Sequence, residues 1–105
     1  MIQLSEVTTA GWCVVTVRGR ADADSADELE AALRTALNNN AKVAADLSGL
    51  DYVSSAGLRA LIQAARAAEA RGGEFAICSP TPSVKRVFDM SGLHQILNIH
   101  GALPC

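Results

Sequence analysis

The chain has few of the residues that carry metal, redox or nucleic-acid chemistry. Its three cysteines, Cys13, Cys78 and Cys105, are widely spaced and form no C-x-x-C pair, which argues against a metal or redox site. Cys13 and Cys78 stand in apolar, strand-like runs, so we expect buried thiols that pack as small hydrophobic groups. A formal net charge of −2 gives no electrostatic basis for binding nucleic acid or an anionic membrane.

Long apolar runs and targeting signals are missing as well. No stretch approaches the ~20 residues that a transmembrane helix needs, and the N-terminus has no basic segment followed by an apolar run. We therefore expect a cytoplasmic protein that does not insert directly into a membrane. Half of the residues are hydrophobic and no Pro-, Gly- or charge-rich linker divides the chain, so residues 1–105 are expected to form a single domain.

Hydrophobic periodicity predicts the order of helices and strands. Residues 2–7 and 12–18 are typical of two strands of a hairpin that turns at Ala10-Gly11. Later strands are predicted at 42–47, 74–78 and 96–99, and helices at 25–38, 55–70 and from Pro82 through Phe88. This alternation predicts an α/β fold with a mixed, mostly parallel sheet, an N-terminal hairpin and helices packed on the sheet.

The predicted helix and strand ends carry polar residues with specific jobs. Ser25-x-x-Glu28 is a capping-box pattern for the first helix. Residues 38–40 are all asparagine, which tolerates left-handed backbone angles and is expected to close that helix. Arg71-Gly72-Gly73 is expected to end the second helix. Asp46 and Ser48 are expected to cross-link the turn after the third strand through side-chain to backbone hydrogen bonds.

Two adjacent serines, Ser54 and Ser55, stand where the strand pattern changes to a helical one. Ser55 is expected at or beside the helix N-terminus, where backbone N–H groups lack intrahelical partners and the helix dipole favours negative charge. A hydroxyl there can be a cap, a nucleophile or a phosphate acceptor. Physical chemistry alone favours a simple N-cap at Ser55 over phosphorylation, and both stay open at this point.

The nucleophile and nucleotide-binding alternatives find little support in the rest of the chain. The pattern G-x-S-x-G of a nucleophile elbow is absent, and His94 and His100 are more typical of surface positions than of catalytic bases. Neither G-x-x-x-x-G-K-[ST] nor G-x-G-x-x-G occurs, so no nucleotide site is predicted. We expect no enzymatic activity and no bound metal or cofactor.

Three motifs in order resemble those of the STAS domain of bacterial anti-sigma factor antagonists. The first is GRAD at residues 19–22, the second is DLSGLDYVSSAGL at 46–58, and the third is PSVKRVFDMSGL at 82–93. The resemblance covers roughly residues 2–100. It implies the STAS fold and a regulator that works by partner switching.

In that family an anti-sigma factor of the GHKL-type serine-kinase class binds the unphosphorylated antagonist and releases its target regulator. The resemblance implies that this kinase phosphorylates Ser55 and so switches the antagonist off, until a PP2C-type phosphatase restores it. ATP and Mg²⁺ belong to the kinase. Sporulation-type antagonists carry an acidic residue at the position of Ser54, so this chain departs from them in having a second hydroxyl beside the target, and Ser54 is the less favoured alternative acceptor.

The resemblance also implies a partner-binding surface around the serines. It comprises Asp22, Ser54, Ala56, Gly57 and Arg59. Simple solvation is the other interpretation of Asp22 and Arg59, whereas Leu58, Leu61 and Ile62 are expected in the core. The alternative function is a non-switching STAS subunit of a transporter-associated or other multiprotein assembly, in which Ser55 is only a cap.

Overall fold

A computed structural model describes residues 2–92 and 98–100 of the chain. Its elements, in order, are β1 (Ile2–Thr9), β2 (Trp12–Ala21), α1 (Ala26–Asn39), β3 (Lys42–Val53), α2 (Ser55–Ala70), β4 (Glu74–Cys78), α3 (Pro82–Ser91) and β5 (Asn98–His100). The five strands lie in the order β1-β2-β3-β4-β5, with β1 antiparallel to β2 and each later pair parallel. The predicted α/β fold with a mixed, mostly parallel sheet and an N-terminal hairpin is confirmed.

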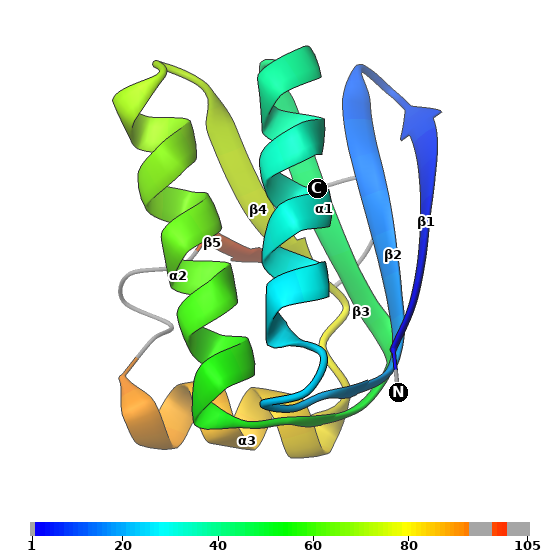
Figure 1. Ribbon diagram of the computed structural model, residues 1–105, viewed down its shortest axis with the longest axis vertical. Coiled ribbons are helices and arrows are strands. Elements are labelled where there is room, and N and C mark those ends of the chain that lie inside the picture. Colours follow the sequence, from blue (N-terminus) through cyan, green and yellow to red (C-terminus); the bar gives the residue numbers. More distant parts are fainter. Residues whose placement is uncertain (1, 93–97, 101–105) are drawn as a thin grey trace.

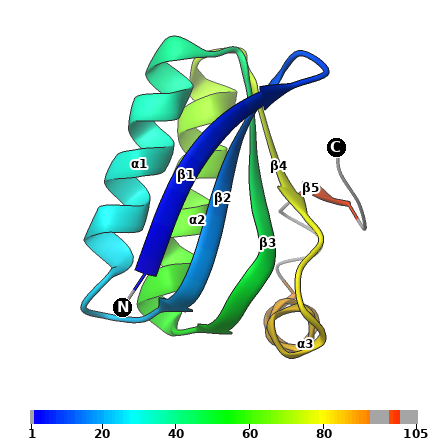
Figure 2. The same cartoon turned by 90° about the vertical axis from the view of Figure 1, so that its right-hand side faces the viewer.

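Two helices cover one face of the sheet, and the third lies elsewhere. Figure 1 shows α1 and α2 side by side in front of the strands. In Figure 2, which views the sheet nearly edge-on, α3 lies on the other side, close to the end at which β3 runs into α2. The prediction that helices pack on the sheet is therefore right for α1 and α2, while α3 packs against the last part of β3.

The main core lies between the sheet and the pair α1 and α2. Alternate strand residues point into it, and the helices contribute leucines at helical spacing. Its fully buried large side chains include Leu29, Leu33, Leu61, Val15, Val17, Val43, Leu47 and Ile77. The opposite face has a smaller cluster of Val14, Ala44 and Cys78 with Trp12 packed against it.

Both cysteines within the described residues are buried, as predicted, but only Cys13 is a free thiol, because Cys78 is disulfide-bonded. Cys13 is 5% exposed and Cys78 is fully covered. Burial, with a smaller contribution from the negative charge of Glu6, raises the pKa of the Cys13 thiol. Since the thiolate is the reactive form, Cys13 acts as a packing group and not as a nucleophile.

The third strand is longer than its sequence pattern predicts. A strand over residues 42–47 was expected to end at Ser48-Gly49, but β3 continues to Val53. Two shifts in the pairing register with β2 absorb the break, so the strand bends without ending. Glycine is needed at position 49 because a Cβ there would lie 2.8 Å from Cγ of Arg18.

At the ends of α1 the predicted capping box is wrong, whereas the asparagines close the helix as predicted but without left-handed backbone angles. Ser25 precedes the helix, but its side chain makes no capping hydrogen bond, so the Ser25-x-x-Glu28 capping box is not formed. Asn40, the C-cap residue, has extended backbone angles (φ −142°, ψ 141°) in place of left-handed ones, and its side-chain amide donates to the carbonyl of Ala36 instead.

Other predicted ends are confirmed, some with a changed role. Arg71-Gly72-Gly73 ends α2, and the amides of all three residues bond to carbonyls in its last turn. The Asp46 carboxylate accepts from the amide of Ser48, but it does so inside β3 and not in a turn. The last predicted strand, 96–99, is found at 98–100; residues 96 and 97, like His94, lie outside the described residues.

Candidate functional site

The two serines occupy different positions at the start of α2. Ser54 is the single residue between β3 and α2 and has extended backbone angles (φ −90°, ψ 176°). Its hydroxyl oxygen accepts from the amide of Gly57 at 3.2 Å, and its carbonyl accepts from the amide of Leu58 at 2.8 Å. Ser54 is therefore the N-cap, and the interpretation of Ser55 as the cap is wrong.

Ser55 is the first residue of α2 and is exposed. Within the described part of the chain its hydroxyl makes no hydrogen bond. Its position is one at which the helix dipole and the free backbone N–H groups favour negative charge. The site thus presents one structural hydroxyl and, next to it, one that is available to solvent.

The start of α2 is held tightly against the end of β2. The amide of Ser54 donates to the carbonyl of Ala21 at 2.8 Å. A Cβ at position 57 would lie 2.6 Å from that carbonyl oxygen and 2.9 Å from Cγ2 of Val53, so only glycine fits. Gly57 is itself buried, which assigns it a packing role beneath the predicted surface.

Asp22 follows β2 at the same edge of the sheet, because parallel β2 and β3 both end there. Its side chain is half-exposed and folded onto its own loop: Oδ1 accepts from the amides of Asp24 and Ser25 at 3.1 and 3.2 Å and lies 3.1 Å from the Ser25 hydroxyl. The Ser25 hydroxyl is the largest cause of the lowered pKa of Asp22. Asp22 is thus ionised and fixed in direction at neutral pH.

A shallow hollow of about 120 Å³ separates the first turns of α1 and α2. Small side chains form most of its lining, and charged groups complete it. The lining residues are Ala23, Ala26, Asp27, Glu30, Ala56, Arg59 and Ala60. Two predicted site residues, Ala56 and Arg59, therefore lie on one continuous surface with the start of α1.

The acidic side of this hollow was not predicted from the sequence. Asp27 and Glu30 are three residues apart on α1, a spacing that places both side chains on one helix face. That spacing is the signal that could have identified them. The opposing charge of Arg59 comes from α2, and no local pattern predicts that the two helices meet there.

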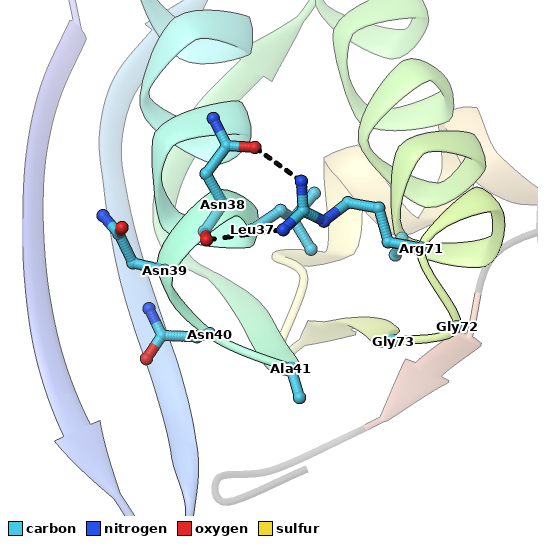
Figure 3. Close-up of a pocket in the computed structure, with 9 residues that line it drawn as sticks. Leu37, Asn38, Asn39, Asn40, Ala41, Arg71, Gly72 and Gly73 are labelled. Carbon is cyan, nitrogen blue, oxygen red and sulfur yellow. Dashed lines mark hydrogen bonds between the residues drawn. The ribbon is translucent and has the colours of Figure 1, made fainter.

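A larger hollow of about 300 Å³ lies at the opposite end of α1 and α2. Figure 3 shows Arg71 reaching from the end of α2 to Asn38 at the end of α1. Its guanidinium donates to the side-chain oxygen of Asn38 at 2.8 Å and approaches the carbonyl of the same residue at 3.4 Å. These contacts join the two helix ends, so we assign this region a structural role.

The described residues contain no cluster of three or more histidine, cysteine or acidic side chains placed to hold a metal ion. None of the described helices combines the length and the apolar character that crossing a membrane requires.

Comparison with known families decides the assignment. The family described as "Mlab, STAS domain" matches residues 5–99. The chain belongs to the STAS domain family. Its fold and its three sequence motifs agree with that membership.

Similar proteins are named as anti-sigma factor antagonists. The chain is 33% identical over 90 residues to BtrV of Bordetella bronchiseptica, a candidate anti-sigma factor antagonist. The matched region covers 85% of this chain and 78% of BtrV. It is 28% identical over 92 residues to the anti-sigma F factor antagonist of Paenibacillus polymyxa, covering 86% and 79% of the two chains.

A solved structure of an anti-sigma factor antagonist is also similar to this chain. The unphosphorylated anti-sigma factor antagonist SpoIIAA superposes with a TM-score of 0.74 at 25% identity, covering 94% of this chain and 87% of SpoIIAA. SpoIIAA, from Bacillus, has also been solved in a phosphorylated form, with a TM-score of 0.69 at 23% identity.

Proposed function

We propose that this STAS protein is a cytoplasmic anti-sigma factor antagonist that is switched off by phosphorylation of Ser55. The observation that carries the proposal is the exposed Ser55 hydroxyl, which is not needed to cap α2 because the Ser54 side chain does so. The names of the relatives support the antagonist function, and the existence of a phosphorylated SpoIIAA supports covalent switching. The chain is the regulated component and not an enzyme.

The proposed reaction is a phosphoryl transfer carried out by the partner. A GHKL-type kinase, which is also the anti-sigma factor, transfers the terminal phosphoryl group of Mg²⁺-bound ATP to Oγ of Ser55. The hydroxyl proton is lost and ADP leaves. A PP2C-type phosphatase then hydrolyses the ester with water and regenerates the serine and inorganic phosphate.

The surroundings of Ser55 explain how one phosphate changes binding and not folding. At the first position of α2, the added charge of nearly −2 faces the favourable end of the helix dipole. A partner that covers the site would have to bury the same charge, which opposes binding. The proposed contacts are Asp22, which follows β2 at the end of the sheet where α2 begins, and Ala56 and Arg59 in the first turns of α2.

The test uses the purified chain, a GHKL-type kinase encoded in the same genome, and ATP with Mg²⁺. Intact mass should increase by one phosphoryl group, and peptide mapping should place it on Ser55. Ser55→Ala should remain unmodified, and the matched control Ser54→Ala should still accept phosphate. A phosphate on Ser54, or equal modification of Ser55→Ala, would contradict the site assignment.

The alternative is a non-switching STAS subunit of a transporter-associated or other assembly. It predicts stable association with partners and no phosphate uptake in the same experiment. Binding that is equally tight for wild type and for a Ser55 variant carrying a charge would favour this alternative.

A further inference from the structure

We infer that Ser25 is a positioning residue for Ser55, because its buried hydroxyl fixes the peptide group on which the start of α2 is held. The inference rests on the proposed function in taking Ser55 as the phosphate acceptor. It concerns a residue whose sequence pattern indicates a different job, that of a helix cap.

The Ser25 side chain is buried and fully used in hydrogen bonding. It is 4% exposed, and among the described residues only Asp46 is also a buried polar or charged side chain. Its one hydroxyl proton lies between the carbonyl of Arg20 at 2.8 Å and Oδ1 of Asp22 at 3.1 Å, and its oxygen accepts from the amide of Asp22 at 3.0 Å. The carbonyl of Arg20 and the amide of Asp22 flank Ala21, so one hydroxyl holds both peptide groups around that residue.

A single peptide group then connects Ser25 to the phosphate acceptor. The amide of Asp22, held by Ser25, and the carbonyl of Ala21, which accepts from the amide of Ser54 at 2.8 Å, belong to the same planar unit. Fixing one end of a planar peptide orients the other end. Hydrogen bonds aligned in series also polarise and strengthen one another.

Loss of the Ser25 hydroxyl should therefore change the position of Ser55. The carbonyl of Arg20 and the amide of Asp22 would lose their partner in a part-buried site, and the loop would shift to satisfy them. Ser54, the residue bonded to that loop, directly precedes the acceptor. Phosphoryl transfer depends steeply on alignment, so a small displacement of Oγ of Ser55 lowers the rate.

The first measurement uses the chain alone. In Ser25→Ala, NMR hydrogen exchange of the Ser54 amide should be at least about fivefold faster than in wild type, the ratio that one net hydrogen bond represents. The amide of Leu61, in the middle of α2, should keep its protection. Ser25→Thr retains the hydroxyl and should restore the exchange rate.

The second measurement is phosphorylation by the kinase that modifies the wild-type chain. Ser25→Ala should lower kcat by about tenfold or more, with a smaller change in KM. The matched control is Thr81→Ala, which removes a hydroxyl that donates to the carbonyl of Leu50 at 2.9 Å near the same edge of the sheet. Thr81→Ala should leave kcat unchanged, and Ser25→Thr should recover it.

Several results would overturn the inference. They are unchanged Ser54 exchange in Ser25→Ala, an unchanged kcat, or an equal loss of kcat in Thr81→Ala. If Ser25→Ala does not fold, Ser25→Cys keeps the side-chain shape with a weaker donor and replaces it in both measurements. Failure of the wild-type chain to accept phosphate would instead reject the proposed function, and the exchange experiment would still decide whether Ser25 holds Ser54.

Discussion

At the scale of single residues, the neighbouring hydroxyls of Ser54 and Ser55 have different surroundings. Ser54 bonds to the amide of Gly57, whereas Ser55 is exposed. Ser54→Ala should lower the free energy of unfolding by about 1 kcal/mol, the usual cost of losing an N-cap. Ser55→Ala should change it by less than about 0.5 kcal/mol, as is usual for a surface substitution.

Urea denaturation of both variants measures this difference directly. The two substitutions remove the same atom from adjacent residues, so each is the control for the other. A larger destabilisation by Ser55→Ala than by Ser54→Ala would reject the assignment of the cap.

Asp22 provides a second prediction at this scale. Hydrogen bonds to its carboxylate, above all the one from the Ser25 hydroxyl, lower the pKa of Asp22 in the folded chain. Because the folded value lies below the unfolded one, the resulting stabilisation is complete above the unfolded pKa of about 4. It is lost as the pH falls through the folded pKa.

NMR titration of the Asp22 carboxyl carbon tests this relationship. In Ser25→Ala the pKa of Asp22 should rise towards its ordinary value, while Thr81→Ala should leave the titration curve in place. An unchanged Asp22 titration in Ser25→Ala would show that the hydroxyl does not stabilise the carboxylate.

At the scale of elements, α1 and α2 are attached to the sheet and to each other by contacts of unequal strength. Leu33 of α1 is fully buried, so Leu33→Ala should cost about 2–5 kcal/mol of folding free energy. Arg71 bridges to Asn38 on the exposed surface, so Arg71→Ala should cost less than about 1 kcal/mol. Thermal and urea denaturation should rank the variants in this order; the reverse ranking would mean that the polar bridge holds the helices.

The elements themselves could largely be predicted from local patterns. Strands at 2–7, 12–18 and 74–78 and the three helices follow from apolar periodicity, and the structure contains all of them. The extension of β3 to Val53 could not be predicted, because Ser48-Gly49 is a typical strand break. It depends on a register shift against β2 and on Arg18 covering Gly49, which are contacts between residues far apart in the chain.

The site was predictable in composition and not in detail. The positions of Ser54 and Ser55 between a strand and a helix follow from the sequence, but which one is the cap depends on where α2 begins, to within one residue. The role of Ser25 could not be predicted either, because it depends on the direction in which its side chain points. Its hydroxyl turns back to Arg20 and Asp22, which the capping-box pattern does not anticipate.

At the scale of the whole molecule, the proposed switch changes a surface and leaves the fold in place. Ser55→Asp adds one negative charge where the α2 dipole favours it, so the melting temperature should stay within a few degrees of the wild-type value. Affinity for the kinase should fall by at least about tenfold, because an unpaired charge would be buried at the interface. Calorimetry measures both quantities, with Ser55→Asn as an uncharged control of similar size.

Two results would contradict this description. Equal kinase affinity of Ser55→Asp and Ser55→Asn would remove charge as the cause of release. A large drop in the melting temperature of Ser55→Asp alone would show that the charge acts by unfolding the chain.

The placement of the cap on Ser54 has a consequence for the evolution of such chains. Because the residue 55 side chain makes no structural hydrogen bond, a single codon change there would, under the proposed switch, give a protein that binds constantly or one that never binds, with the domain intact. Under the proposed switch, one copy could lose its dependence on a kinase in one step after gene duplication, while mutations that remove the capping side chain at 54 or the glycine at 57 are opposed by selection for folding. Descendants of one ancestor are then expected to differ freely at position 55, to keep a capping residue at 54 and to keep glycine at 57.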